Sequence, residues 1–282
     1  MSKEISFRIL EDIARDLSGN EISFPTFLDV TFQIRGALKN PNLTVDQLSV
    51  LVGAEPLMST KVIRLANSAA LNSSGRTISD VKSAITRVGM EAVRTISFAV
   101  AMEQLLGSKK MAPFEWISKR LWEHTIHVAA MCRVLARKVA KINADEAMFA
   151  GLVHDIGVFY LLSRATNFPE LIEDKVELYE LLVQWHDNIG HALLSAMKLG
   201  EELLGAVLEH EVERPVVAVK TLADVLFVAN KLANLKTTWR NPESDEEDNL
   251  SALNGLFDAE AISTLLAESE EDVASLKAAL AG

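Results

Sequence analysis

Apolar residues recur at intervals of three and four along most of this 282-residue chain, which predicts a succession of amphipathic helices. The first of these places Ile5, Ile9, Ile13 and Leu17 on one stripe before Gly19. Further helices are expected at 24–38, 44–53, 56–70, 79–88 and 90–107. Period-two alternation bounded by turns, the signature of strands, is absent throughout. The predicted fold class is therefore all-α.

Helix boundaries are marked by residues that suit the ends of helices. Thr44 with Gln47 makes a capping box, and Pro56 suits the first turn of the helix that follows. Asp80 or Ser79 caps the next helix, which Gly89 ends. These signals support the helix limits given above.

The stretch from residue 116 to 162 carries the candidate chemistry. Its first helix has one inward stripe, formed by Leu121, His124, Thr125, Val128, Cys132, Leu135 and Val139. Asn143 with Glu146 is expected to begin a second helix, which leads to the adjacent pair His154-Asp155 and stops near Gly157. An inward imidazole facing a second imidazole and a carboxylate favours a divalent metal.

These residues resemble a known superfamily. The context L-W-E-H-T around His124, followed by A-G-L-V-H-D-I-G, is similar to the HD metal-dependent phosphohydrolases. The runs E-P-L-M-S-T-K-V-I-R-L-A-N-S-A and I-S-D-V-K-S-A-I-T-R-V-G narrow the resemblance to the HDOD family, the HD-related output domain of bacterial signalling proteins, as do F-P-T, W-H-D-N-I-G-H-A-L-L and A-V-L-E-H. The resemblance covers about residues 20 to 235 and implies a two-lobed helical bundle, for which we expect lobes at 1–110 and 111–240. The acidic composition of 241–282 predicts a linker and helical tail beyond it.

The departures from the family pattern concern the site. The resemblance implies metal ligands at His124, His154 and Asp155, with Asn230 where the phosphohydrolases place an aspartate. Val158 replaces a lysine found in the active phosphodiesterases, and the segment 197–200 and His210-Glu211 also depart from the HDOD pattern. A neutral amide is a poorer ligand for a dication than a carboxylate, so we expect a degenerate site with at most one carboxylate.

Three interpretations of this site remain open: a buried hydrogen-bond network, a bound metal without turnover, and catalysis. We expect no cofactor and no catalytic residue. If a metal binds, Mg²⁺, Mn²⁺ or iron is the candidate, and if the site is active, Asp155 bridges the metal. His186 and His191 lie five apart on one expected helix, so they cannot form an i,i+4 metal pair; we interpret them as a core contact and a surface residue.

Composition narrows the function. Residues 241–282 hold eleven acidic residues and one base, whereas the rest of the chain is nearly neutral, which disfavours a nucleic-acid binder. This weighs against a third hypothesis, a transcription regulator that uses a helix-turn-helix at 79–105. A single cysteine, Cys132, the lack of a signal peptide and the lack of an apolar run near membrane-spanning length favour a cytoplasmic protein.

The function expected from the resemblance is a non-catalytic regulatory module that binds a signalling protein or a small effector, without nucleic acid or membrane. The alternative is a metal-dependent phosphohydrolase acting on a nucleotide or phosphodiester. In the tail, 241–250 is expected to be a linker, and Asp258 and Ser269 are expected to cap two short amphipathic helices. Their apolar faces should dock on the body or on a second copy, which leaves a homodimer open, and deleting 241–282 should promote aggregation.

Overall fold

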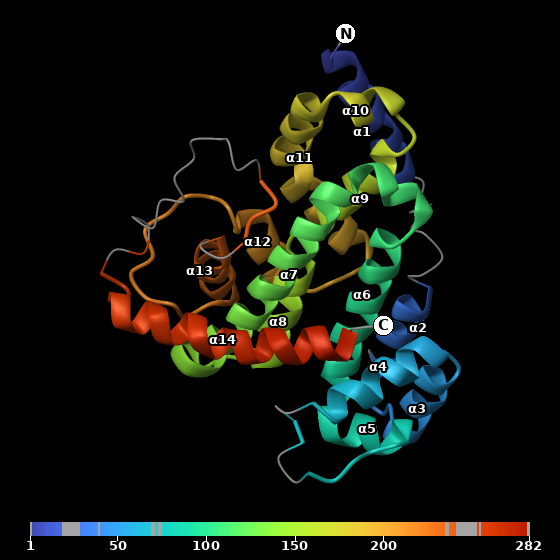
Figure 1. The fold of residues 1–282 in the computed structure, drawn as a ribbon, viewed down its shortest axis with the longest axis vertical. Coiled ribbons are helices and arrows are strands. Elements are labelled where there is room, and N and C mark those ends of the chain that lie inside the picture. Colours follow the sequence, from blue (N-terminus) through green and yellow to red (C-terminus); the bar gives the residue numbers. More distant parts are fainter. Residues whose placement is uncertain are drawn as a thin grey trace. The chain divides into compact units, whose positions relative to one another are not determined.

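The computed structural model describes residues 2–18, 29–38, 40–68, 71–72, 75–234, 237–240, 253 and 255–280. Regular secondary structure in these ranges is entirely helical, which confirms the all-α prediction (Figure 1). The α-helices are α1 (Ser2–Ser18), α2 (Asp29–Leu38), α3 (Val45–Gly53), α4 (Pro56–Ala66), α5 (Val81–Val88), α6 (Met90–Leu106), α7 (Glu115–Leu135), α8 (Ala144–Val153), α9 (Ile156–Ala165), α10 (Pro169–Glu173), α11 (Lys175–Ala196), α12 (Glu201–Glu209), α13 (Leu222–Asn234) and α14 (Ala259–Leu280). A 3-10 helix, η2 (Lys109–Phe114), precedes α7, and a π-helical turn, η3 (Ala136–Ala140), follows it.

The chain divides into two compact units, each made from two separate stretches. Unit 1 comprises 1–23 and 105–266, and unit 2 comprises 24–104 and 267–282. The change near residue 105 lies close to the expected lobe boundary at 110. The first 23 residues, however, belong with the later helices, and the end of the tail belongs with the early ones.

Unit 2 contains the early helices α2 to α5. The predicted helix starts at Thr44, Pro56 and Asp80 are confirmed, whereas α4 ends at Ala66, before the predicted limit at residue 70. Thr44 and Gln47 form both bonds of the capping box, and Pro56 occupies the first turn of α4. Asp80 caps α5, which ends at Gly89 with φ of 86°. The part of the expected second helix before α2 lies outside the described residues.

Asn67 at the end of α4 has a role beyond capping. Its side-chain amide donates to the carbonyl of Ile78 at 2.7 Å, and its oxygen accepts from the Ile78 amide at 2.8 Å. Arg87 of α5 adds bonds to the carbonyls of Ala66 and Arg76 and to the side chain of Asn72. Asn67, from the L-A-N-S motif, and Arg87, from the A-I-T-R-V-G motif, thus fix the connection between α4 and α5.

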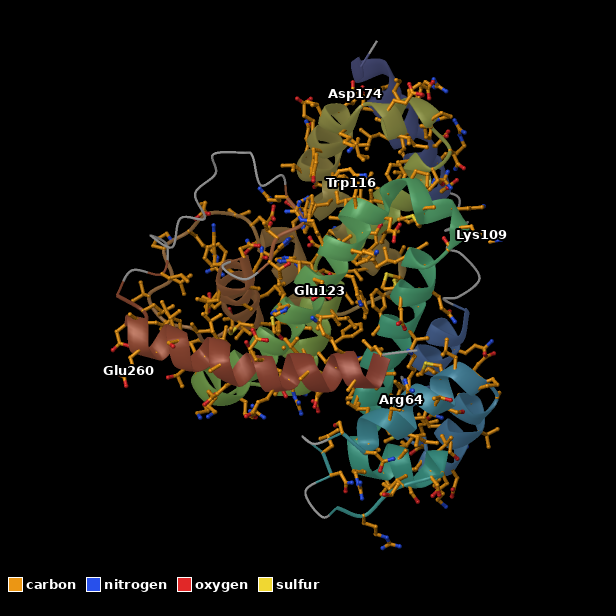
Figure 2. All side chains as sticks on the ribbon, in the orientation of Figure 1. Arg64, Lys109, Trp116, Glu123, Asp174 and Glu260 are labelled. Atoms are coloured by element: carbon orange, nitrogen blue, oxygen red, sulfur yellow. The ribbon has the colours of Figure 1, made fainter. Side chains whose placement is uncertain are left out.

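Unit 1 is organised around α7, which packs along α8 and α13, while α11 packs on α9 and α12 (Figure 1). The predicted inward stripe of α7 is buried from Leu121 to Leu135. The α-helix ends at Leu135, although the expected stripe continues to Val139. The chain forms the π-helical turn η3 from residue 136 and then reverses at Lys141, which has the left-handed conformation. Trp116 and Glu123, labelled in Figure 2, mark the two turns of α7 that precede His124.

One apolar stretch reaches membrane-spanning length, contrary to the expectation that none would. Residues 144–165 meet the length and composition of a membrane span, and 89% of the most apolar window is buried within the protein. The stretch is divided between α8 and α9 by the turn at His154-Asp155. Such burial is typical of core helices, and this pair of helices carries the candidate site.

The tail forms one long helix, so the prediction of two short ones is wrong. Asp258 does cap its beginning, since its carboxylate accepts from the amide of Ala261 at 2.7 Å. Ser269 lies buried inside α14 instead of at a helix start. The apolar spacing continues through 269, and nothing there breaks the helix. The predicted linker at 241–250 lies outside the described residues.

The carbonyl of Leu280 near the end of α14 is held by Lys61 of α4. The Lys61 ammonium, only 2% exposed, donates to this carbonyl and to the carboxylate of Glu103 at 3.1 Å. A lysine this deeply buried requires such partners, since an unpaired buried charge is strongly destabilising. The contact fixes the last turn of α14 within unit 2.

We expect Leu276→Asp to lower the melting temperature, because it places a carboxylate where the side chain is 5% exposed. The cost should be about 3 kcal/mol or more, from lost apolar burial and a buried charge. Ala274→Asp, at an exposed position of the same helix, is the control and should melt like the wild type. Equal melting of the two variants, measured by circular dichroism, would show that the apolar face of α14 is not docked.

A second stability prediction concerns Asp224 at the start of α13. Its carboxylate accepts from the amides of Lys220 and Thr221 and from Arg214, and the Thr221 hydroxyl accepts from the amide of Asp224. Burial alone would raise the pKa of Asp224, but the Thr221 amide and Arg214 more than offset it, so the pKa is lowered. The stabilisation is therefore present above about pH 4 and is lost as the pH falls through the lowered value.

We expect Asp224→Asn to cost about 1–2 kcal/mol at pH 7, because the charged acceptor of three hydrogen bonds is lost. The difference in melting temperature from the wild type should narrow as the pH falls below about 4. Thermal melts of both proteins across this range test the point. A difference that stays constant with pH would contradict an ionised Asp224.

Candidate metal centre

Two glycines place the His154-Asp155 turn in the middle of unit 1. A Cβ on Gly151 would lie 2.6 Å from the Cα of Ala129, so α8 approaches α7 more closely than any side chain would allow. A Cβ on Gly157 would lie 2.0 Å from the backbone oxygen of His186, so α9 approaches α11 in the same way. The sequence G-L-V-H-D-I-G thus carries the pair between α7 and α11, where His154 and Asp155 are almost fully buried.

The prediction that Gly157 ends a helix is therefore wrong. Gly157 lies in the first turn of α9, which continues to Ala165. Its φ is not in the left-handed region that would make glycine a helix terminator. The residue is glycine because the backbone of α11 occupies the space that a side chain would need.

Four of the six histidines converge at this turn. His124 of α7 and His154 were predicted together, and their Nε2 atoms lie 3.3 Å apart. His186 of α11 and His210 at the end of α12 complete the group, with neighbouring imidazole rings 5.0–5.5 Å apart. The interpretation of His186 as a plain core contact is thus incomplete, because its ring faces Asp155.

Each imidazole is oriented by a backbone carbonyl at its Nδ1. The acceptors are Thr237 for His124 at 3.0 Å, Gly151 for His154 at 2.7 Å, Leu182 for His186 at 2.9 Å and Val207 for His210 at 2.6 Å. A carbonyl oxygen can only accept, so every Nδ1 carries the proton and every Nε2 of a neutral ring presents a lone pair. Metal-binding histidines are commonly fixed in this way.

Asp155 lies between two groups of ligand atoms. Its Oδ2 is 3.1 Å from Nε2 of His154 and 3.8 Å from Nε2 of His124. Its Oδ1 is 3.8 Å from Nε2 of His186 and 3.7 Å from Nε2 of His210. We call the first group the α7–α8 half and the second the α11–α12 half of the cluster. Neither carboxylate oxygen has a hydrogen bond within the described part of the chain.

The α11–α12 half contains two further carboxylates, Asp187 and Glu211. Oδ1 of Asp187 lies 2.6 Å from Nε2 of His186, and Oε2 of Glu211 lies 3.4 Å from the same atom. The four side chains of His186, Asp187, His210 and Glu211 can bring one ligand atom each within 4.8 Å of the others, as can His124, His154 and Asp155. The group of His124 and His154 has the single carboxylate that was expected, and the other two carboxylates lie in a second group that the sequence did not predict.

Burial and charge set the protonation of the α7–α8 half. Burial lowers the pKa of His124 to about 4, although the charge of Asp155 and the Thr237 carbonyl act in the opposite direction. Burial would raise the pKa of Asp155, but the neighbouring imidazoles hold it well below its usual value. At neutral pH this half therefore has a neutral His124 beside an ionised carboxylate.

The α11–α12 half has the opposite balance. Burial alone would lower the pKa of His186, but Glu211 and Asp187 raise it well above its usual value. The pKa of His210 is raised for similar reasons, with Asp155 and Glu211 outweighing burial. Burial would raise the pKa of Glu211, yet His186, His210 and Arg240 lower it. The carboxylates of this half thus require positive charge close to them.

Residues 237–240, which we call the strap, lie against the cluster. The carbonyl of Thr237 orients His124, and the ring of Trp239 meets His186 edge-on at 5.5 Å. The guanidinium of Arg240 pairs with Glu211. Arg120 of α7 fixes the strap by donating to the carbonyls of Thr238 at 3.1 Å and Arg240 at 2.9 Å. The strap therefore contacts both halves of the cluster.

Asn230, the fourth predicted ligand, lies on α13 and is 4% exposed. Its side-chain oxygen is buried and has no hydrogen-bond partner among the described residues. Because α13 packs on α7 and α8, the residue lies in the same core. Its role as a ligand stays a prediction.

Sequence reasoning missed the four ligand candidates of the α11–α12 half. The i,i+4 spacing relates His186 only to His191 on the same helix, whereas the neighbours of His186 come from the turn before α9 and from the end of α12. The order of the motifs could have indicated these residues, because W-H-D-N-I-G contains His186 and Asp187 and A-V-L-E-H contains His210. His191 is half-buried on α11 and is not in the cluster.

Comparisons with known proteins agree with this architecture. A family model described as HDOD domain matches residues 24–212. A crystal structure of a proposed metal-dependent phosphohydrolase from Shewanella amazonensis SB2B superposes with a TM-score of 0.74, at 23% identity, covering 96% of this chain and 99% of that one. A proposed signal transduction protein from Marinobacter aquaeolei VT8 gives 0.63 at 15% identity, covering 99% of this chain and 66% of that one.

One curated relative matches over most of this chain. It is an uncharacterized protein of Treponema pallidum (strain Nichols), 24% identical over 217 residues, which are 74% of this chain. The match spans only 39% of that relative's length. At these identities the solved structures establish only the fold, so the chemistry of the site must be argued from the residues of the cluster.

We expect Gly157→Ala to damage both stability and the cluster. The added methyl would meet backbone atoms of His186 and Gly190, which cannot rotate away, so α9 and α11 must separate. The cost should be about 1–3 kcal/mol or more from overpacking. Gly205→Ala in α12 is the control, since a Cβ there meets no atom within 4 Å, and it should be neutral or slightly stabilising. Thermal melts of the two variants test this, and equal stability would contradict the close approach.

Proposed function

The chain belongs to the HDOD domain family, and on that premise we propose that it is a regulatory module of signal transduction whose buried cluster binds a divalent metal. The observation that carries the proposal is the common direction of the four imidazoles. Their Nδ1 atoms are all held by carbonyls, so all four Nε2 atoms face one carboxylate, and each can offer a lone pair to a metal when its ring is neutral. At 3.3 Å, the lone pairs of His124 and His154 repel each other unless a cation or a proton lies between them.

The donor set fits a transition metal better than a hard ion. Imidazole nitrogens with carboxylate oxygens suit iron, manganese or zinc, whereas magnesium prefers oxygen ligands and water. His124, His154 and Asp155 would provide one group of ligands, and His186, His210, Asp187 and Glu211 the other. A bound dication would supply the positive charge that the buried carboxylates require, and would tie α7, α11 and the connecting turns together.

A regulatory role is favoured over hydrolysis by how the cluster is enclosed. The four imidazoles and Asp155 are at most 2% exposed, and the strap lies against them with Trp239 and Arg240. A phosphoryl group must reach the metal for hydrolysis, so the strap would have to move first. The neutral Asn230, in place of the aspartate that the resemblance to phosphohydrolases calls for, points in the same direction.

The alternative is a metal-dependent phosphohydrolase, and one observation favours it. The two halves share Asp155, and a carboxylate that bridges two metal positions is typical of hydrolases that clamp a phosphate. In that case Asp155 would bridge, the histidines would bind the metals, and Arg120 and Arg240, which lie at the strap, would be cationic side chains for the phosphate. The solved Shewanella neighbour carries a name of this kind.

Signal transmission requires a partner, and we propose a signalling protein or a small effector that recognises the fold. The solved structure from Marinobacter aquaeolei VT8, described as a proposed signal transduction protein, motivates this choice. The acidic composition of 241–282 makes a nucleic-acid partner unfavourable, because phosphate backbones are recognised by basic surfaces. A homodimer is one form that such a regulator could take.

The test is metal content and phosphodiesterase rate measured side by side. We expect the wild type, purified without chelator and supplied with Mn²⁺ or Fe²⁺, to hold metal by elemental analysis and to leave bis(p-nitrophenyl) phosphate uncleaved. His186→Ala should weaken metal binding about tenfold or more by removing a ligand. His191→Ala, on the same helix but outside the cluster, is the matched control and should bind like the wild type.

Different results would redirect the assignment. A metal-free wild type whose His186→Ala variant only loses stability would favour the buried hydrogen-bond network. Metal-dependent turnover that is abolished by His154→Ala would establish the phosphohydrolase instead. Only bound metal without turnover agrees with the proposed function.

A further inference from the structure

The carboxylates of the cluster are distributed unevenly. The α7–α8 half has only Asp155, which it shares, and α13, which packs on α7, α8 and α12, carries the neutral amide of Asn230 in the core. The α11–α12 half has the same shared carboxylate together with Asp187 and Glu211. Because each anionic ligand increases the attraction for a dication, the second half should bind metal more tightly.

The α11–α12 half already has a cation beside it. Arg240 pairs with Glu211, and its guanidinium lies 5.8 Å from the ring centre of Trp239, which in turn contacts His186. A guanidinium is always charged, so it can neutralise a buried carboxylate in the absence of metal. A metal that takes Glu211 as a ligand must therefore compete with Arg240 for this carboxylate.

The inference that follows rests on the proposed metal binding. We propose that the α11–α12 half binds metal more tightly than the α7–α8 half. In this proposal, Arg240 occupies Glu211 without metal, and the metal displaces it. The displaced residue lies on the strap, whose Thr237 carbonyl orients His124 and whose two other carbonyls are held by Arg120. Metal in one half thereby changes a segment that also contacts the other half.

This arrangement gives the strap a function as a metal-dependent element. Without metal, the Arg240–Glu211 pair holds the strap against α12. With metal, the guanidinium loses this partner while Arg120 keeps the strap backbone in place. The charge of Arg240 is then no longer balanced by Glu211. A change in metal occupancy is converted in this way into a change in surface charge.

Calorimetric titration of the full chain with Mn²⁺ tests the inference. Glu211→Gln keeps the shape and removes the charge, and should weaken the first metal about tenfold or more. Glu213→Gln is the matched control, since Glu213 lies in the same loop, pairs with Lys231 and is outside the cluster. It should bind the first metal with a dissociation constant within about twofold of the wild type.

Two further variants examine the other half and the competing cation. Arg240→Gln removes the competitor and should tighten the first metal, whereas Arg240→Lys keeps a cation and should stay closer to the wild type. Asn230→Asp adds an anion to the core formed by α13 with α7, α8 and α12, and should raise the total metal bound without weakening the first equivalent. Elemental analysis of the dialysed proteins gives the stoichiometry independently.

The outcomes separate this inference from the proposed function. If the wild type binds metal and His124→Ala abolishes the first equivalent while Glu211→Gln does not affect it, the tighter position is the α7–α8 half and the inference is wrong. If Arg240→Gln weakens the first metal, Arg240 supports binding and is not a competitor. If the wild type binds no metal at all, both the inference and the metal-binding proposal fail.

Discussion

The close approach of α9 to α11 at Gly157 is the constraint on which the site depends. The backbone of His186 fills the space where a side chain on residue 157 would be, and Gly151 allows the same closeness between α8 and α7. With any larger residue at these positions, the turn between α8 and α9 could not lie between the two long helices. Asp155 would then reach the histidines of only one side. The glycines on either side of the His-Asp pair are therefore as much a part of the site as the ligands.

Local chemistry explains why so much of the fold could be predicted from the sequence. The capping box of Thr44, the proline at the start of α4 and the cap by Asp80 act within one helical turn, so the letters alone determine them. The role of Gly157 could not be predicted, because it depends on the backbone of His186 in α11, about thirty residues later. Ser269 was misjudged because a residue that suits a helix start can also lie inside a helix when the apolar spacing continues around it.

In the candidate site too, the features that depend on local sequence could be predicted and those that depend on tertiary packing could not. His124 and the His154-Asp155 pair could be predicted, since an inward position on an amphipathic helix and an adjacent pair are visible in sequence. His186 and His210 could not be placed, because their meeting depends on how α11 and α12 pack around the turn. The decisive consequence concerns charge. Asn230 suggests a site short of anions when read alone, whereas Asp187 and Glu211 supply two carboxylates from elements that the motif does not include.

The buried carboxylates can be neutralised by protons, by Arg240 or by a metal. The raised pKa values of His186 and His210 follow from their anionic neighbours, and the guanidinium of Arg240 serves the same carboxylate. Since these cations compete for one set of ligands, metal binding must release protons, move Arg240, or do both. In a hydrolase, Arg240 would have to leave Glu211 and turn to the phosphate of the substrate. In the proposed regulator, the same release would report occupancy of the cluster through the strap.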